Sequence, residues 1–181
     1  LFVRGPRAIT TVAEQRRARE AEFGEFAGNL MDYYVADSDA EALSVEVDYN
    51  TDSWFARSTR ELVQAMARTP ANSFMYVFTR NLDDPTARSP HAMELRYVFD
   101  ELPADASAVD QDIAQLMNNY WTQFAATGNP NGPGLPPWPS YNLETQQHQI
   151  IGAELGQGAF LLREQLDELD RYIRDRYNSA K

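Results

Sequence analysis

The sequence has 181 residues, of which 43% are hydrophobic and 12% aromatic. This is enough for one domain with a sizeable core and too short for two ordinary domains, so disorder is not expected. With 27 acidic and 16 basic residues, the net charge of -11 repels nucleic-acid phosphates and anionic lipid surfaces, and we expect neither as a partner. The absence of cysteine excludes disulfides, zinc-thiolate sites and cysteine nucleophiles.

Other sequence patterns give little support to metal, cofactor or membrane functions. Only His91 and His148 could ligate a metal through nitrogen, and no pattern arranges carboxylates around them. The phosphate-loop, Gly-x-Gly-x-x-Gly and Gly-x-Ser-x-Gly patterns are absent too, so no cofactor is expected. No run of about 20 apolar residues could span a bilayer, which predicts a soluble chain, either cytoplasmic or secreted. The start, LFVRGP, has neither an initiator Met nor a signal-peptide pattern and is typical of a strand end or loop within a longer chain.

Helical patterns dominate the first 70 residues. Thr11 and Glu14 have the spacing of a capping box, which predicts one or two helices over 11–35, and Ser38 with Glu41 predicts a short second helical element. Asp52 could cap a third helix. That helix should end near residue 68, because the proline at position 70 disfavours helical geometry in the residue before it. The apolar residues expected on these helices are Phe23, Phe26, Leu30, Tyr34, Phe55, Leu62, Val63 and Met66.

The pattern then changes to that of a sheet. Residues 73–79 (SFMYVFT) are aromatic and β-branched, as is typical of a parallel strand buried on both faces. A polar loop over 80–90 leads to His91, and a second apolar piece follows over 95–99.

The rest of the chain reads as helix, loop, strand and helix. A long helix is predicted from Val109 to a stop at Gly128 and Pro130. Residues 128–141 are rich in proline and glycine but contain Trp138, which indicates an ordered loop. A last strand is predicted over 148–155. An amphipathic terminal helix would carry Leu162, Leu166, Leu169, Ile173 and Tyr177.

His91 is the one feature that points to chemistry. It stands in a loop after a predicted buried strand, where sheet proteins place working residues, but a histidine known only by such a position is more often structural than catalytic. His148 opens the predicted last strand beside a run of glutamines, which is typical of a surface or strand-end residue.

Three motifs carry a resemblance to a known family. FMYVFT (74–79) with SPHAMELRYVF (89–99) resembles the strand and histidine loop of the cholinesterase and type-B carboxylesterase family. That family's pattern is roughly Tyr-x-Phe, a polar loop, then Gly-Ala-x-His-Gly-x-Glu-Leu-x-Tyr-Val-Phe. NYWTQFAATGNPN (119–131) and WPSY (138–141) resemble its Tyr-Trp-x-x-Phe-Ala-x-Thr-Gly-Asp-Pro-Asn and Trp-Pro-x-Tyr. The resemblance is specific over 73–141 and looser elsewhere.

The chain departs from the family pattern around the histidine. Ser89 and Pro90 replace the common Gly-Ala before it, and Ala92 replaces the glycine after it, so the loop has less backbone freedom. The lack of cysteine resembles the bacterial esterases rather than the disulfide-bearing animal members.

The resemblance implies an α/β fold, the C-terminal part of an α/β-hydrolase fold with few strands and several helices, completed by a missing N-terminal portion. Residues 1–181 would be the C-terminal segment of a single α/β-hydrolase domain. We expect it to be mainly helical over 1–70, with the strand and catalytic histidine loop over 71–100. A helix, a proline-rich loop, a strand and the terminal helix would fill 101–181.

The resemblance also implies a function for the loop histidine. His91 would be the general base of a Ser-His-Glu/Asp triad that hydrolyses small-molecule carboxylic esters, with Glu94 in a supporting place. The family's acid motif, Asp-Glu-Gly-x-Leu-Phe, would put the acid just before Leu1, and the nucleophilic serine and oxyanion loop further upstream. The partner would therefore be the N-terminal portion of the same esterase, without which we expect no hydrolysis.

Several aromatic residues could line a substrate pocket or fill the core. Trp54 and Phe55 are weak substrate-pocket candidates, whereas the residues expected in the core are Tyr97, Trp121 and Trp138. A cholinesterase-like fold can also serve as a non-catalytic scaffold or adhesion domain, which the retained His91 mildly disfavours. A free-standing helical interaction module is the third alternative, although the sequence contains no recognition motif for it.

Overall fold

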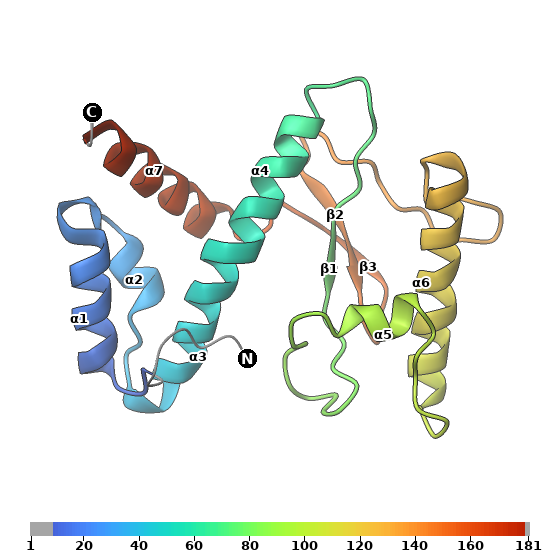
Figure 1. The fold of residues 1–181 in the computed structure, drawn as a ribbon, viewed down its shortest axis with the longest axis horizontal. Coiled ribbons are helices and arrows are strands. Elements are labelled where there is room, and N and C mark those ends of the chain that lie inside the picture. The colour runs from blue at the N-terminus through green and yellow to red at the C-terminus, as the bar shows by residue number, and fades with distance from the viewer. Residues whose placement is uncertain (1–8, 180–181) are drawn as a thin grey trace. The chain divides into compact units, whose positions relative to one another are not determined.

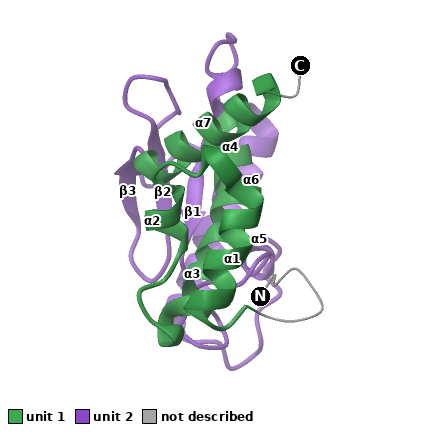
Figure 2. Cartoon of the chain, turned by 90° about the vertical axis from the view of Figure 1, so that its left-hand side faces the viewer, with its two compact units in different colours: residues 1–62, 162–181 green, residues 63–161 purple. Residues whose placement is uncertain are grey.

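A computed structural model describes residues 9–179, so the expectation for residues 1–6 lies outside the described part. The chain divides into two compact units, one built from the described residues up to 62 and from 162 onward, the other from 63–161 (Figure 2). The elements in chain order are α1 (Val12–Phe23), η1 (Gly24–Phe26), α2 (Leu30–Tyr34), α3 (Asp39–Thr51), η2 (Asp52–Ala56), α4 (Arg57–Met66), β1 (Tyr76–Phe78), α5 (Glu94–Val98), α6 (Ala108–Thr127), β2 (Gln147–Ile151), β3 (Gly156–Ala159) and α7 (Arg163–Ser179) (Figure 1).

The helical unit begins where the capping-box pattern predicts. The Thr11 side-chain oxygen accepts a hydrogen bond from the Glu14 N–H at 3.2 Å, and the Glu14 carboxylate accepts one from Thr10 N–H at 3.3 Å. Helices α1 and α2, separated by the 3-10 turn η1, confirm the expectation for 11–35. Ser38 precedes α3 as predicted, but its hydroxyl donates to the Glu41 carboxylate at 2.9 Å, and α3 is 13 residues long rather than short.

Aromatic rings form the centre of this unit. Phe23 packs edge-on against Tyr49 and Tyr172, with ring centroids 5.7 and 5.1 Å apart, and Tyr34 packs against Tyr49 at 5.0 Å. The predicted terminal helix is confirmed as α7. Its buried residues are Leu166, Leu169 and Tyr172, while Ile173 and Tyr177 of the predicted stripe are exposed.

Two buried polar side chains join α1 to the segment that contains α3. Gln15 accepts a hydrogen bond from Ala36 N–H at 2.7 Å and donates one to the Ala42 carbonyl at 3.1 Å. Arg19 donates to Glu46 at 2.5 Å. Because the Gln15 amide and the terminal nitrogens of Arg19 have partners, the burial of these side chains is tolerated, and the pairs fix how the two helices align.

The predicted helix start at Asp52 is wrong. Helix α3 continues through η2, a π-helical turn, into α4, and Asp52 itself has helical dihedral angles (φ -68°, ψ -46°). Its carboxylate is buried and accepts a hydrogen bond from the Tyr34 hydroxyl at 3.0 Å. Burial raises the pKa of Asp52 to about 6, although the Tyr34 hydrogen bond acts in the opposite direction. The predicted end of the third helix is confirmed to within two residues, since α4 ends at Met66.

Three strands form the sheet of the second unit, in the order β1-β2-β3 (Figure 1). β1 pairs parallel with β2, with Tyr76 opposite Gln149, and β2 pairs antiparallel with β3. The predicted parallel strand is confirmed, but it has three residues and they are half-buried rather than buried on both faces. β3 was not predicted, because its sequence Gly-Gln-Gly-Ala lacks the β-branched and aromatic residues that indicate a strand.

Helix α6 and the proline-rich loop after it complete the core of this unit. The helix ends at Gly128 in a left-handed conformation (φ 74°), as predicted. In the loop, the buried Trp138 donates its indole N–H to the Met75 carbonyl at 3.1 Å. Its backbone N–H and carbonyl both bond the Asn131 side chain, at 2.7 and 2.9 Å. These contacts confirm that residues 128–141 form an ordered loop.

His148 lies near the start of β2, as the strand-end alternative predicts, but it is buried, so the alternative of a surface position is wrong. It is the second residue of β2 and only 4% exposed, and burial lowers its pKa. Gly158 is its partner on β3. A Cβ at position 158 would lie 2.4 Å from the His148 Nε2, so the missing side chain of Gly158 makes the room that the ring occupies.

We expect Asp52→Asn to raise the free energy of unfolding at pH 8 by about 1–3 kcal/mol. The folded-state pKa of about 6 lies above the unfolded value of 3.8, so the carboxylate destabilises the fold increasingly as the pH rises from 4 to 6, and fully above that. The gain should shrink below pH 6 and vanish near pH 4. Urea unfolding followed by circular dichroism measures it, with the exposed Asp37→Asn as the control. An equal gain at every pH would contradict the role of burial.

Gly158→Ala should lower the free energy of unfolding by about 1–3 kcal/mol, because the new methyl group overlaps the buried His148 ring. Gly156→Ala is a matched control on the same strand, since its Cβ would meet only Ile150 at an ordinary 3.9 Å. Thermal or urea unfolding of both variants checks the prediction. Equal losses in the two would show that glycine itself, and not the space for His148, matters on β3.

Candidate active site

His91 lies in the loop that connects the carboxyl end of β1 to α5. It is exposed and begins the turn of residues 91–93 that precedes the helix. Two residues later the chain enters the core, because Met93 is 8% exposed and its N–H donates to the Pro90 carbonyl at 3.2 Å. The imidazole is therefore held at the surface just before a buried anchor, at the end of a parallel strand where ligand sites of α/β proteins form.

A buried ion pair fixes the start of this loop. Arg80 donates from Nε and Nη2 to the two carboxylate oxygens of Asp110, at 2.7 and 2.9 Å. Asp110 stands in the first turn of α6 and also accepts from the Tyr97 hydroxyl of α5 at 2.8 Å and from Ser107 at 2.5 Å. Arg80 is the main cause that holds the pKa of Asp110 far below its usual range. The Asp110 carboxylate thus joins the start of the loop, at Arg80, to α5 and α6.

The exposed part of the loop is shaped by its own polar side chains. Asn81 accepts hydrogen bonds from the N–H groups of Asp83 and Asp84 at 3.0 and 3.1 Å and donates to the Arg88 carbonyl at 2.9 Å. These are the local bonds by which Asn typically stabilises a turn. The buried Asn81 side chain therefore joins the two ends of the segment 81–88, and Asp84 adds hydrogen bonds from Thr86 within it.

Ala92, directly after His91, has a positive φ of 65°. Left-handed geometry places a Cβ too close to the following carbonyl, which costs a non-glycine residue about 1–2 kcal/mol. The departure from glycine noted in the sequence therefore falls on a position where the backbone favours glycine.

Glu94 is the first residue of α5 and is half-buried. Burial first, and then the charge of Glu94, raise the pKa of Tyr76 to about 12, so this carboxylate acts electrostatically on β1. The catalytic role of His91 and the supporting role of Glu94 both stay predictions.

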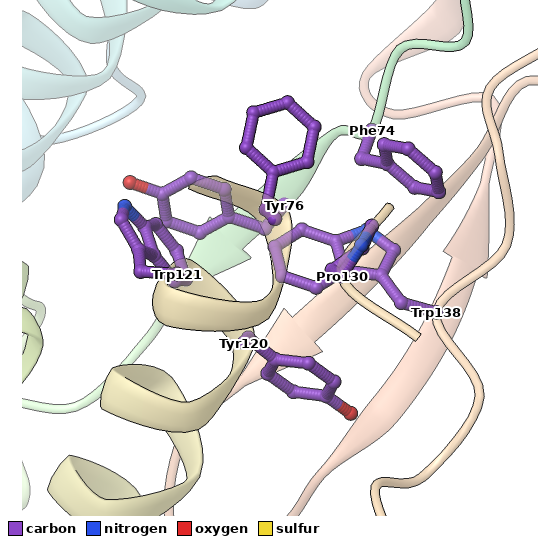
Figure 3. A pocket seen from close by; sticks show the side chains of 7 residues that line it. Phe74, Tyr76, Tyr120, Trp121, Pro130 and Trp138 are labelled. Atoms are coloured by element: carbon purple, nitrogen blue, oxygen red, sulfur yellow. The ribbon is translucent and has the colours of Figure 1, made fainter. Parts of the chain in front are cut away.

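A pocket of about 160 Å³ opens beside β1 (Figure 3). Its lining residues are Phe74, Tyr76, Tyr120, Trp121, Phe124, Pro130 and Trp138. Tyr97 and Trp138 are core residues as expected, whereas Trp121 is only half-buried and lines this pocket. Trp54 and Phe55 lie in η2 of the other unit and are not among its lining residues. The pocket was not predicted, because its aromatic residues come from separate elements.

Among residues 9–179, none of the helices combines the length and the apolar character that a membrane span requires. Within the same residues, no three His, Asp or Glu side chains gather where they could hold a metal ion.

The sequence patterns do not predict the Arg80–Asp110 pair. A local signal exists for half of it, since Ser107 and Asp110 have capping-box-like spacing and the Ser107 hydroxyl accepts from Asp110 N–H at 3.2 Å. The partner Arg80 lies 30 positions earlier, and no local pattern connects the two.

Solved structures share this fold. A PNB esterase matches with a TM-score of 0.67 and 24% identity over 87% of this chain and 32% of its own. A thermophilic PNB esterase matches with a TM-score of 0.72 and 22% identity over 93% of this chain and 35% of its own. The α/β-hydrolase fold class is thereby confirmed, with this chain covering only part of the fold.

Proteins that are similar in sequence are also named as esterases. Carboxylesterase 1C of Mus musculus is 28% identical over 138 residues, which are 72% of this chain and 25% of that protein. Carboxylesterase 3B of Mus musculus is 37% identical over 89 residues, 44% of this chain and 15% of that protein. The chain thus spans at most about a quarter of these relatives. The sequence model described as "Carboxylesterase family" matches residues 7–168, and the chain therefore belongs to the carboxylesterase family.

Proposed function

We propose that the chain supplies the general base, His91, of an enzyme that hydrolyses carboxylic esters. The proposal rests mainly on the position of His91. This residue is exposed in the loop that follows the carboxyl end of a parallel strand, and its loop is held by the Arg80–Asp110 pair on one side and by the buried Met93 on the other. The family match over 7–168 supports ester hydrolysis as the reaction class. The identity of the ester is set by residues that we place mainly outside this chain.

In the proposed reaction, a serine hydroxyl attacks the ester carbonyl while His91 takes the hydroxyl proton. The resulting imidazolium returns that proton to the leaving alcohol, which leaves an acyl-enzyme and a neutral imidazole. His91 then takes a proton from water as it attacks the acyl group, and returns it to the serine when the acid is released. An imidazole suits both directions of transfer, because it can accept a proton on a ring nitrogen and donate it again.

The other members of the triad lie, in this proposal, in a portion N-terminal to Leu1. That portion supplies the serine, the acid that orients the imidazole, and the oxyanion loop. The family resemblance supports a supporting role for Glu94, which stands three residues after His91 at the start of α5. The proposed substrate is a small-molecule ester, and the acidic chain favours neither nucleic acid nor an anionic membrane as a partner.

His91→Ala should lower ester turnover by at least about 10³-fold in the chain assembled with the portion encoded before Leu1, because the proton transfer loses its base. Hydrolysis of p-nitrophenyl butyrate measures this. Added imidazole should restore part of the activity by entering the vacated space. Ala87→Ser, an exposed change in the same loop, is the control and should leave the rate unchanged.

Two results would contradict this proposal. Activity of the assembly that survives His91→Ala would remove the histidine from the mechanism, and turnover by the 181-residue chain alone would remove the need for an upstream serine. An assembled protein with no turnover at all would instead favour the non-catalytic scaffold.

Ala92→Gly should raise the free energy of unfolding by about 0.5–1 kcal/mol, since relief of the positive φ outweighs the added freedom of the unfolded chain. Ala87→Gly, in the same loop but without a positive φ, should instead lower it by about 0.4–1 kcal/mol. Urea unfolding compares the two. Opposite signs are the expected result, and a loss in both would contradict strain at Ala92.

A further inference from the structure

We infer that the aromatic pocket beside β1 is a binding site for a small neutral aromatic molecule that carries a carbonyl oxygen. All the residues that line this pocket belong to the unit 63–161 (Figure 3). The ring of the ligand would lie among the aromatic side chains, and its carbonyl oxygen would accept hydrogen bonds from Tyr76 and Trp121. This site goes beyond the proposed function and does not depend on it.

Two of the lining rings are fixed by hydrogen bonds to the backbone. The indole N–H of Trp138 donates to the Met75 carbonyl at 3.1 Å, and the Tyr120 hydroxyl donates to the Pro136 carbonyl at 2.7 Å. These two rings also pack edge-on against each other, with centroids 5.1 Å apart. The walls of the pocket are therefore in place before a ligand enters, which lowers the entropic cost of binding.

The size and the lining of the pocket fit one aromatic ring. Its volume of about 160 Å³ is close to that of an apolar protein cavity of about 150 Å³ that binds benzene. Of the seven lining side chains, six are aromatic and the seventh is Pro130. Phe74 and Phe124 already meet edge-on at 6.0 Å, and a ligand ring can join such packing.

Two polar groups of the lining are still open. Among residues 9–179, neither the Tyr76 hydroxyl nor the Trp121 indole N–H has a hydrogen-bond partner, and both atoms are accessible to solvent. The two rings meet edge-on with centroids 5.2 Å apart. Figure 3 shows the hydroxyl and the indole nitrogen at the same end of the pocket. Because a carbonyl oxygen has two lone pairs, we place the ligand's oxygen at this end.

The charges around the pocket favour a neutral ligand. An indole N–H can only donate, and the Tyr76 hydroxyl stays protonated at neutral pH, since burial first and then the charge of Glu94 raise its pKa to about 12. Aromatic faces attract cations, but the two donor hydrogens oppose a cation at this end. The charge of Glu94 opposes an anion, and the lining contains no basic side chain to offset it.

Two ligands of nearly the same shape test the inference. They are acetophenone and α-methylstyrene, which has a CH2 group in place of the carbonyl oxygen. The protein is the assembly of this chain with the co-expressed polypeptide encoded before Leu1, and NMR spectra follow the indole N–H signals of the chain. Acetophenone should move the Trp121 signal further downfield than α-methylstyrene does, because only acetophenone accepts a hydrogen bond. Trp54, which lies in the other unit, is the internal control and should not respond.

Tyr76→Phe tests the second donor without removing the ring. The variant should bind acetophenone at least ~5-fold more weakly, because one hydrogen bond is lost, and its affinity for α-methylstyrene should change by less than ~2-fold. Tyr177→Phe, at an exposed position in the other unit, is the matched control and should change neither affinity. The same NMR titrations measure all of these affinities.

Several results would overturn the inference. One is a lack of acetophenone binding, and another is binding to the chain alone but not to the assembly, which would mean that the other portion fills the pocket. Equal losses for the two ligands in Tyr76→Phe would remove the hydrogen bond from recognition. Tighter binding of phenyltrimethylammonium would assign the pocket to cations.

Failure of this inference is distinguishable from failure of the proposed function. The indole signals report only on the pocket, whereas turnover of p-nitrophenyl butyrate reports on the proposed reaction. Acetophenone binding without turnover would support the pocket and contradict the proposed function, and turnover without acetophenone binding would do the reverse.

Discussion

The bidentate ion pair between Arg80 and Asp110 is the interaction on which the candidate site depends. It joins the second residue after β1 to the first turn of α6, and the same carboxylate binds the Tyr97 hydroxyl of α5. His91 lies between these points, so the ends of its exposed loop are fixed. Both side chains are nearly inaccessible, and loss of one partner from a buried pair typically costs about 3–5 kcal/mol.

Ala92 in one unit and Asp52 in the other both oppose stability. Ala92 has a left-handed backbone beside His91, and Asp52 is a buried carboxylate whose main neighbour is a tyrosine hydroxyl. A positive φ is not confined to the proposed catalytic loop, since Asp100, Gln146, Phe160 and Leu162 share it. No proposed catalytic residue lies in the unit that contains Asp52. Its raised pKa follows from burial and needs no catalytic explanation.

The sequence predicts what is local or carried by the family motifs. Capping spacing and apolar stripes identify the helices, and the aromatic run identifies β1, because these signals lie within one element. The helix start predicted at Asp52 is wrong because the helix continues through this position, and His148 is at a strand end as predicted but is buried against a facing glycine. The Arg80–Asp110 pair was missed because its residues lie 30 positions apart. The motifs find the family and His91 but cannot show how the loop is anchored.

The functional unit in this account is larger than the chain, which contributes one anchored histidine. The most direct test is a crystal structure of this chain together with the polypeptide encoded before Leu1. We predict a serine Oγ within hydrogen-bond reach of the His91 Nε2, about 2.6–3.2 Å, and a carboxylate at its Nδ1. A structure in which His91 faces solvent, with no serine or carboxylate near its ring, would contradict the account.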